Sequence, residues 1–422
     1  MGRLPWLAFF LLRILRLTVR LDMASHVIGS TTTLNFPSRR AATGRAGSAP
    51  GRKWFLGHPV ASRPMERLGL VGLPNSGKTS LFNALTGADA PVASHPFTTT
   101  ETAVAAAPLP DARLDALAAM SSSRKVVRAG MEVVDIAGLV SGSSTGEGLG
   151  NRFLAGIREV DALCVVLRAF EDPEVPGDTS PVEALATLEL ELVLADIATV
   201  ETQLDKRRRA AKSDKSLAGE IAAMETASKE LSAGTPLYRA KLGPDDRGLL
   251  KSLFLLTDKP VLAVVNLGED QLGRSDELTG AVATALEGRG EALGVCLQLE
   301  AEAARLAPEE RAELLEGLGL GAGALARVAQ SAYLLLGRRV FLTTGDKESR
   351  AWSFRAGANA AECAGVIHSD LQRGFIRAEV IHWDELIELG SWAAAKSAGR
   401  IRLEGKDYEV ADGDVLEIRF NV

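Results

Sequence analysis

The sequence predicts an α/β core that carries a helical insertion and is followed by a smaller α+β domain. Three observations support this prediction. A glycine-rich motif at residues 72–79 separates a short apolar run from a helical pattern. Apolar runs typical of buried parallel strands recur at 131–135, 162–167 and 260–265. After residue 338, short strand-like and helix-like segments alternate, which is the pattern of a small α+β domain.

Composition limits the class of protein. With 422 residues, 46% of them hydrophobic, the chain is long enough for two or three domains with sizeable cores. The three cysteines, Cys164, Cys296 and Cys363, form no C-x-x-C pair, which predicts a reducing compartment and neither a disulfide framework nor a cysteine zinc site. The net charge of −6 argues against a large nucleic-acid footprint, although not against a local one.

The first 64 residues have a different composition from the rest. Residues 1–65 hold ten Arg and Lys and one acidic residue, Asp22, and residues 23–64 are rich in Ser, Thr, Ala, Arg and Gly. This composition is typical of an organellar transit segment, for which we expect the chloroplast rather than the mitochondrion, with the cytoplasm as the alternative. A disordered tail, or a start at Met23 or Met65, would explain the same composition.

We expect this extension to stay outside the folded core and not to insert stably into a membrane. Its apolar run at residues 4–17 is interrupted by Arg13 and Arg16 and is too short for a membrane span.

The glycine-rich motif is a phosphate-binding pattern. Gly72-Leu-Pro-Asn-Ser-Gly-Lys-Thr79 fits G-x-x-x-x-G-K-[ST], between a predicted strand at 67–71 and a predicted helix from residue 80. In that context, backbone N–H groups and the helix N-terminus surround phosphate oxygens. Lys78 would reach the β- and γ-phosphates, and the Thr79 hydroxyl would bind Mg²⁺. The predicted nucleotide-binding residues of this loop are Asn75, Ser76, Gly77, Lys78, Thr79 and Ser80.

Two later segments have the features of nucleotide-sensing switches. Thr99, in a threonine-rich loop, would sense Mg²⁺ and the γ-phosphate, with a plain loop as the alternative. Asp135 ends an apolar run, and a carboxylate at the end of a strand can hold Mg²⁺. The backbone N–H of Gly138 can approach the γ-phosphate because glycine has no side chain to block it. The predicted metal ligands are therefore Thr79, Thr99 and Asp135.

The residue after Gly138 departs from ordinary GTPases. It is Leu139, whereas many GTPases place a glutamine there to orient the attacking water. A leucine side chain cannot do this, so the catalytic group is unknown and hydrolysis is expected to be slow. Glu147, in the glycine-rich loop that follows, is a weak candidate for which a solvated role is the better interpretation.

The run at 260–265 ends in Asn266-Leu-Gly-Glu269, at the place of the base-recognition sequence Asn-Lys-x-Asp. We expect Asn266, Leu267 and Glu269 to flank the base, with Leu267 covering one face by apolar contact. Glu269 is one methylene longer than Asp, which spoils a bidentate pair with guanine. ATP is therefore expected to bind more tightly than GTP. Residues 295–299 are expected to form the closing strand.

Two amphipathic helical patterns lie in an insertion at about residues 182–255. The positions at helical spacing are Leu190, Val193, Ile197, Val200 and Leu204, then Leu217, Ile221, Met224, Ser228 and Leu231. They predict an antiparallel coiled-coil arm, with two ordinary helices packed on the core as the alternative. The turn between them, residues 206–215, contains six basic residues and one acidic residue, Asp214, and would reach RNA phosphates.

After residue 338 the sequence predicts strands at 340–344, 351–355, 376–381, 401–403 and 415–420, with a helix at 360–374. No catalytic constellation is visible there. The predicted organisation is an extension at 1–64, a nucleotide domain at 65–338 and a C-terminal domain at 339–422.

These residues together resemble the YchF/Obg-like ATPase family of P-loop proteins over residues 66–422. The nucleotide domain contributes Gly72–Thr79, Asp135-Ile-Ala-Gly-Leu-Val140, Gly146-Glu-Gly-Leu-Gly-Asn151 and Arg168-Ala-Phe-Glu-Asp172. The segments Ala364–Asp370, Arg373–Val380 and Leu403–Tyr408 look like that family's TGS domain. The resemblance implies an α/β P-loop NTPase (GTPase-like) core of the Obg type, an inserted antiparallel coiled coil and a C-terminal α+β β-grasp (TGS) domain.

The resemblance also implies ATP hydrolysis, dependence on Mg²⁺ and association with the ribosome. Asn75 matches a P-loop asparagine that helps to hold K⁺ in related proteins, or it is only a loop residue. Two departures from the family pattern are Phe97-Thr-Thr-Thr-Glu-Thr-Ala103, where the usual Pro and Asn are missing, and Cys296-Leu-Gln-Leu299, at the place of a base-binding Ser-Ala segment.

We therefore expect a monomeric, ribosome-associated nucleotide switch that binds and slowly hydrolyses ATP. The alternatives are a GTPase and a nucleotide-gated RNA- or ribosome-binding module whose hydrolysis is incidental.

Overall fold

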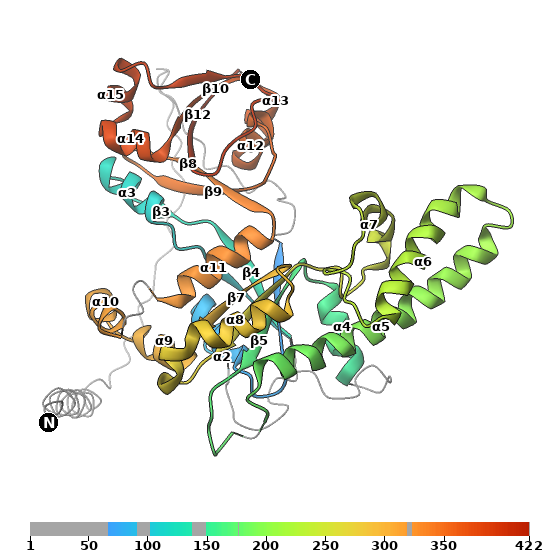
Figure 1. Ribbon diagram of the computed structural model, residues 1–422. Helices are drawn as coiled ribbons and strands as arrows, with labels where there is room; N and C mark the ends of the chain where they lie inside the picture. The colour runs from blue at the N-terminus through green and yellow to red at the C-terminus, as the bar shows by residue number, and fades with distance from the viewer. Residues whose placement is uncertain (1–65, 91–101, 137–148, 176, 319–322, 422) are drawn as a thin grey trace, which may run out of the picture. The chain divides into compact units, whose positions relative to one another are not determined.

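A computed structural model describes residues 66–90, 102–136, 149–175, 177–318 and 323–421 (Figure 1). The extension 1–64 lies outside these residues, as do Thr99, Gly138, Leu139 and Glu147. The predictions made for them are therefore not addressed by the fold.

A six-stranded sheet forms the nucleotide-domain core, in the order β2-β4-β1-β5-β6-β7. All neighbouring strands are parallel except β2, which runs antiparallel to β4. Its strands are β1 (Arg67–Val71), β2 (Ala103–Pro108), β4 (Gly130–Asp135), β5 (Ala162–Arg168), β6 (Val261–Asn266) and β7 (Gly290–Val295). The four strands predicted at 67–71, 131–135, 162–167 and 260–265 are confirmed, and with them the α/β class.

Alternate residues of the central strands enter two separate apolar layers. Cys164 and Val166 of β5 belong to the layer that includes α2 (Lys78–Thr86), α9 (Leu297–Ala303) and α11 (Ala324–Leu335). Leu163 and Val165 belong to the other, which includes α4 (Leu149–Arg158), α5 (Pro181–Ala210) and α8 (Ser275–Ala285). Helices therefore cover both faces of the sheet, as continuous apolar strands require.

The predicted closing strand at 295–299 is wrong. β7 ends at Val295, and residues 297–303 form α9. The backbone N–H of Leu297 donates to the Asn266 side chain (3.4 Å), so a tertiary contact fixes where this helix begins.

The helical insertion is built from α5 and α6 (Ala218–Ser232), which pack on each other (Figure 1). The 3₁₀ turn η2 (Lys215–Leu217) precedes α6. Val193, Val200 and Leu204 are buried in a cluster with Met224 and Leu231 of α6 and part of the following chain. Leu190, predicted to lie on the same stripe, is instead 57% exposed. After α6 come α7 (Pro244–Leu250) and η3 (Lys251–Leu253).

The remaining elements of the nucleotide domain are α3 (Ala112–Met120), β3 (Val126–Val127), η4 (Glu269–Arg274) and α10 (Pro308–Gly317). The chain then enters a second six-stranded sheet, ordered β11-β10-β12-β8-β9-β3. Besides β3, its strands are β8 (Arg338–Thr343), β9 (Ser349–Arg355), β10 (Phe375–His382), β11 (Arg402–Glu404) and β12 (Asp414–Phe420), so the predicted strands of the α+β domain are confirmed.

The C-terminal helices are α12 (Ala360–Ile367), α13 (Ser369–Arg373), α14 (Trp383–Leu389) and α15 (Trp392–Ser397). The single helix predicted at 360–374 is therefore two. His368 takes an extended conformation (φ −164°), and its side chain accepts from the Asp370 N–H to begin α13.

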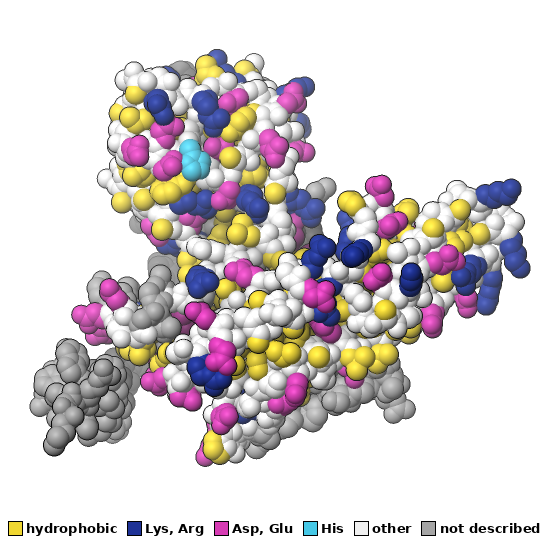
Figure 2. Space-filling view, viewed as in Figure 1, with side chains coloured by type: hydrophobic (Ala, Val, Ile, Leu, Met, Phe, Trp, Pro, Cys, Tyr) yellow, Lys and Arg dark blue, Asp and Glu magenta, His cyan; other side chains and the backbone are white. Residues whose placement is uncertain are grey.

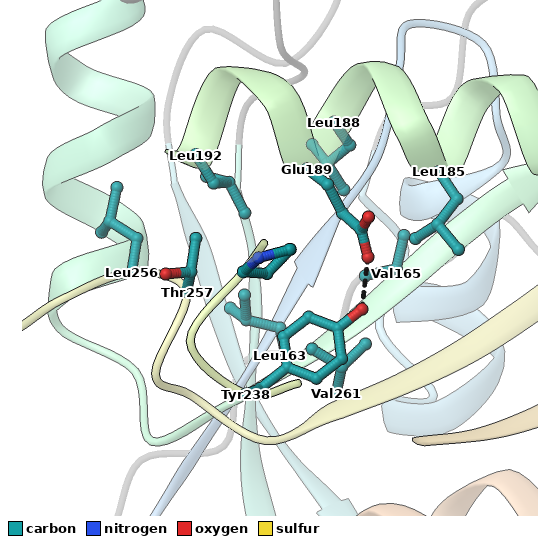
Figure 3. Close-up of a pocket in the computed structure, with 11 residues that line it drawn as sticks. Leu163, Val165, Leu185, Leu188, Glu189, Leu192, Tyr238, Leu256, Thr257 and Val261 are labelled. Atoms are coloured by element: carbon teal, nitrogen blue, oxygen red, sulfur yellow. Dashed lines mark hydrogen bonds between the residues drawn. The ribbon is translucent and has the colours of Figure 1, made fainter. Parts of the chain in front are cut away.

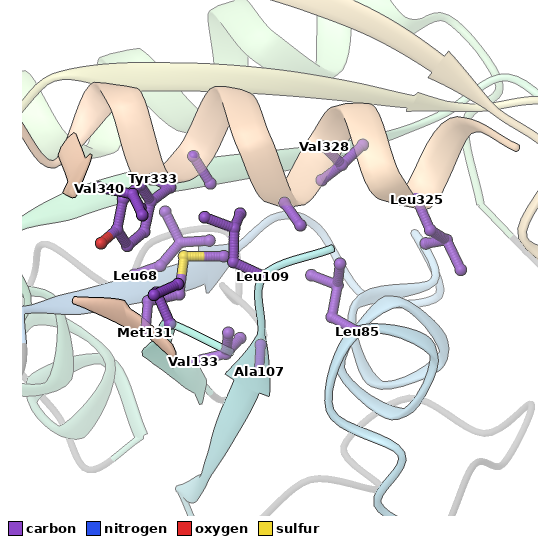
Figure 4. Close-up of a cluster of buried hydrophobic side chains, with 14 of the residues drawn as sticks. Leu68, Leu85, Ala107, Leu109, Met131, Val133, Leu325, Val328, Tyr333 and Val340 are labelled. Carbon is purple, nitrogen blue, oxygen red and sulfur yellow. The ribbon is translucent and has the colours of Figure 1, made fainter. Parts of the chain in front are cut away.

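The C-terminal sheet borrows a strand from the nucleotide domain, because β3 pairs in parallel with β9. Val340 of β8 also joins the apolar layer that holds Leu68 and Met131 of the core sheet (Figure 4). None of the described helices is long and apolar enough to cross a membrane.

Candidate nucleotide-binding site

The phosphate-binding loop lies between β1 and α2, and two of its glycines are required by close contacts. A Cβ at Gly72 would come within 2.4 Å of the Val166 carbonyl oxygen. Gly77 has φ 98°, and a Cβ there would lie 2.4 Å from Nδ2 of Asn266. A side chain at either position would displace the loop from β5 or β6, so these glycines allow the loop to pass close to both strands.

Lys78 is the first residue of α2, and its side chain folds back over the loop. Its ammonium donates to the carbonyl oxygens of Leu73 (2.9 Å) and Gly72 (3.1 Å). The residue is buried. Burial lowers its pKa to about 8, while attraction to Asp135 works in the opposite direction. The fold thus holds a cation at the N-terminus of a nine-residue helix, where phosphate groups bind favourably.

Thr79 and Asp135 meet beside Lys78. The Thr79 hydroxyl donates to Oδ2 of Asp135 at 2.7 Å. Asp135 is buried, and its Oδ1 has no hydrogen-bond partner among the described residues. Burial raises the pKa of Asp135, whereas the Thr79 hydrogen bond and the charge of Lys78 lower it. A hydroxyl oxygen next to a carboxylate with an unsatisfied oxygen suits a hard divalent cation such as Mg²⁺.

The side chain of Asn266 links the phosphate loop to the first residue of α9. Its amide nitrogen donates to the Ser76 carbonyl (3.1 Å), and its oxygen accepts from Leu297 N–H (3.4 Å). Both contacts are buried. Asn266 therefore positions the phosphate loop, a role that its place at the end of β6 does not reveal in the sequence.

The structure does not support base stacking by Leu267. Its side chain is 3% exposed and belongs to the apolar layer formed with α5 and α8. An apolar residue directly after a buried strand has turned into the core. Glu269 is exposed at the start of η4 and has no contact with the phosphate loop among those described.

Arg168 holds the loop of residues 169–175, which lies next to Asn266. This loop was not assigned to the site from the sequence. The Arg168 guanidinium donates to the carbonyls of Phe170 (3.0 Å) and Val175 (2.9 Å) and lies 4.5 Å from the centre of the Phe170 ring. Arg168 pairs in register with Asn266, and the Ala169 N–H donates to the Asn266 carbonyl at 2.9 Å. The available signal in the sequence was an arginine directly after the apolar run 162–167.

The structure thus brings Ser76, Lys78, Thr79, Asp135 and Asn266 together. Asn75 has φ 61°, a left-handed conformation that suits this tight loop, and Ser80 is half-buried on α2. Gly138 and Thr99 lie outside the described residues, and Leu267 and Glu269 are not joined to the phosphate loop.

A small apolar cavity beneath α5 is a packing defect and not a ligand site (Figure 3). It has a volume of about 10 Å³, enough for about one water molecule. Tyr238 and Glu189 line it and are hydrogen-bonded to each other.

Models of known protein families match segments of both the nucleotide domain and the C-terminal domain. A model described as a 50S ribosome-binding GTPase matches residues 67–196. The model YchF-GTPase_C, described as a protein of unknown function (DUF933), matches residues 339–421.

Whole-length relatives agree with these matches. A protein named ribosome-binding ATPase YchF from Bacillus subtilis (strain 168) is 42% identical over 361 residues, which cover 84% of this chain and 99% of that protein. The protein of the same name from Escherichia coli O157:H7 is 40% identical over 360 residues, with the same coverage.

The solved structure of the Schizosaccharomyces pombe YchF GTPase is 30% identical and superposes with a TM-score of 0.74. The matched region covers 86% of this chain and 99% of the Schizosaccharomyces pombe chain. These likenesses confirm a GTPase-like P-loop core followed by a C-terminal domain. Identity at this level over nearly the full length of the relatives shows that the chain belongs to the YchF family.

Proposed function

We propose that this chain is a ribosome-associated nucleotide switch that binds ATP and slowly hydrolyses it to ADP and phosphate. The observation that carries the proposal is the arrangement of Lys78, Thr79 and Asp135 at the N-terminus of α2. Two full-length relatives are named ribosome-binding ATPase, which supports both the activity and the partner.

Each of these residues has a distinct role in the proposed reaction. The Lys78 ammonium would leave the Gly72 and Leu73 carbonyls to bind the β- and γ-phosphates, and backbone N–H groups of the loop would bind the remaining oxygens. Thr79 and Asp135, with Thr99, would hold Mg²⁺, and the Gly138 N–H would sense the γ-phosphate. When bound, Mg²⁺ supplies charge neutralisation on the phosphate oxygens. Asn75 is our candidate for holding a K⁺ ion.

Slow hydrolysis follows from the identity of residue 139. Leu139 cannot orient an attacking water, so an unstimulated rate well below that of a GTPase with a glutamine is expected. A ribosome could raise this rate by contributing the missing group. The alternative, a nucleotide-gated binding module, predicts that hydrolysis does not respond to ribosomes.

For the base we propose a preference for ATP of about tenfold or less, which corresponds to about 1.4 kcal/mol. Glu269 does not reproduce the carboxylate position of an Asn-Lys-x-Asp sequence, and Leu267 lies in the core. GTP remains the alternative, since one relative is named a GTPase.

The test combines binding and turnover. Competition against a fluorescent ATP analogue should show displacement by ATP at lower concentration than by GTP, and Lys78→Ala should abolish tight binding of either. Single-turnover hydrolysis should accelerate when purified bacterial ribosomes are added. Undiminished ATP affinity in Lys78→Ala would remove the central claim, and stronger displacement by GTP would make the protein a GTPase.

We further propose that the protein is a monomer and that it is located in an organelle, the chloroplast rather than the mitochondrion. The support for the location is the basic, Ser- and Ala-rich composition of residues 1–64. Fusing these residues to a fluorescent protein in plant cells tests the location, and cytoplasmic fluorescence would contradict it. Light scattering of the purified chain tests the oligomeric state.

A further inference from the structure

Phe254, at the end of η3, combines two unfavourable features. Its backbone is left-handed, with φ 50° and ψ 46°, a conformation in which a bulky side chain is an outlier. Its side chain is also 63% exposed, more than any other large hydrophobic residue among those described. Left-handed backbone favours glycine, so an aromatic residue at this position calls for a reason outside local structure.

Packing does not supply that reason. On either side of Phe254, Leu253 and Leu255 are buried in the core of the helical insertion. The chain just beyond is fixed by Asp196 of α5, a buried carboxylate that accepts from the backbone N–H groups of Leu256 (2.9 Å) and Thr257 (2.8 Å). These contacts impose the turn, which a glycine would make without strain.

Phe254 also differs from the other non-glycine residues that have a positive φ. Among the described residues, the other non-glycine positions with positive φ are Asn75, Ser122 and Glu287. All three are polar, and Asn75 lies in the phosphate loop. Phe254 is thus the one strained position in the described chain that presents a large apolar side chain to solvent.

We propose that Phe254 is a stacking platform for an unpaired base of ribosomal RNA; this inference rests on the proposed ribosome association. A lone ring matches the flat face of a base, and aromatic side chains bind unpaired bases by stacking. Between residues 233 and 258 the large exposed apolar side chains are Leu249 and Phe254. Two side chains fall far short of the roughly 800 Å² per partner of a stable protein interface.

Charge on the same insertion favours RNA over an apolar partner. Lys251, three residues before Phe254, is exposed. The α7 helix, which leads to Phe254, packs on α6, and α6 begins at the basic turn of the insertion (Figure 1). Lys and Arg side chains gather at the end of the α5–α6 pair (Figure 2), where they can attract the phosphates of the same RNA.

The test uses the full chain with Phe254→Gly and Phe254→Trp. Cosedimentation should show that the glycine variant binds purified bacterial ribosomes about tenfold more weakly, the loss expected for one stacked base. Its affinity for single-stranded polyuridylate should fall similarly, while affinity for duplex RNA and ATP stays unchanged. The tryptophan variant should keep all four affinities. The Tm of the glycine variant should be no lower than that of the wild type, because the strain is relieved.

Three results would overturn the inference. Wild-type-like ribosome binding by Phe254→Gly would show that the ring is not used. Weaker ribosome binding with unchanged affinity for polyuridylate would identify a ribosomal protein as the partner. A markedly lower Tm would show that the ring stabilises the fold. The wild type is the control for the proposed function: if it does not sediment with ribosomes, the ribosome association fails, whereas a change confined to Phe254→Gly concerns this inference alone.

Discussion

Lys78 illustrates how the fold prepares a charge for a ligand. Its ammonium is removed from water and satisfied by two backbone carbonyls, at 2.9 and 3.1 Å, which a triphosphate would replace. Neutral carbonyls are weaker partners than phosphate oxygens for this ammonium, because a phosphate oxygen adds the attraction of its own negative charge to the hydrogen bond. Burial lowers the pKa of Lys78 to about 8, which predicts a pH dependence.

ATP affinity should fall as the pH rises above about 8, by up to tenfold per unit, because nucleotide binding needs the Lys78 ammonium. The free energy of unfolding of the free protein should change in the opposite sense. Between about 8 and 10.5 the unfolded chain holds the proton that folded Lys78 has lost, so stability increases with pH in that window.

Fluorescence titrations at pH 7 to 10 check this expectation, with Lys78→Ala as the control whose residual affinity should not vary. A wild-type affinity that is flat across this range would mean that Lys78 keeps an ordinary pKa.

Asn266 gives a second prediction at the residue scale, because its observed contacts are with the phosphate loop. Asn266→Ala should leave the Ser76 carbonyl buried without its partner and lower the free energy of unfolding by about 1–3 kcal/mol. Since the loop itself is disturbed, calorimetry should show weaker binding of pyrophosphate as well as of ATP and GTP.

Gln271→Ala is the matched control. Gln271 holds the adjacent turn through the Ala169 carbonyl and the Gly268 N–H, and among the described residues it makes no hydrogen bond with the phosphate loop. Its pyrophosphate affinity should equal that of the wild type. If Asn266→Ala lost ATP affinity but kept pyrophosphate affinity, Asn266 would be a base-recognition residue after all.

At the scale of elements, continuous apolar runs predicted the central strands because parallel strands are buried on both faces. The same reasoning gave a wrong prediction for the segment 295–299, because its apolar residues suit either a strand or a buried helix. The contact between Leu297 and Asn266 favours the helix. The phosphate loop was predictable because its chemistry is local. The role of Asn266 and the burial of Leu267 were not, because both depend on which elements pack against the end of β6.

The basic turn between α5 and α6 can now be divided into paired and solvent-facing cations. Arg207 and Arg208 form ion pairs with Glu220 (2.7 Å) and Glu225 (2.8 Å) of α6. Lys206, Arg209, Lys212 and Lys215 are exposed. Only cations that are not already neutralised contribute fully to binding a polyanion.

We therefore expect Lys212→Gln with Lys215→Gln to weaken ribosome binding and to reduce its salt dependence by about one unit of slope per lost phosphate contact. Arg207→Gln with Arg208→Gln removes the same charge but should have a smaller effect on the slope. Cosedimentation at several salt concentrations measures both. Equal slopes in the wild type and the Lys212/Lys215 variant would show that the turn is only a solvated loop.

Across the whole molecule, the nucleotide domain and the C-terminal domain share a structural joint. Strand β3 completes the C-terminal sheet, and Ser123 beside it is within hydrogen-bond distance of Ser349 (2.8 Å). Arg113 of α3 extends the joint: its guanidinium donates to Asp111 and to Asp412 (2.6 Å), and Asp412 in turn accepts from the Val340 N–H (2.7 Å). These contacts join segments far apart in the sequence, so no local pattern predicted them.

Removing this arginine should loosen the joint without touching the nucleotide site. Asp111 is buried and Arg113 is 24% exposed, so Arg113→Ala removes the guanidinium that pairs with a buried carboxylate and leaves it only the backbone N–H of residue 113. This loss should lower the free energy of unfolding by about 1–3 kcal/mol. Arg128→Ala is the control, because its ion pair with Asp115 of the same helix is largely exposed and should contribute less than about 1 kcal/mol. Urea denaturation compares the two variants, and ATP affinity should remain that of the wild type in both. Equal stabilities would show that the two domains are held together by β3 and the apolar layer alone.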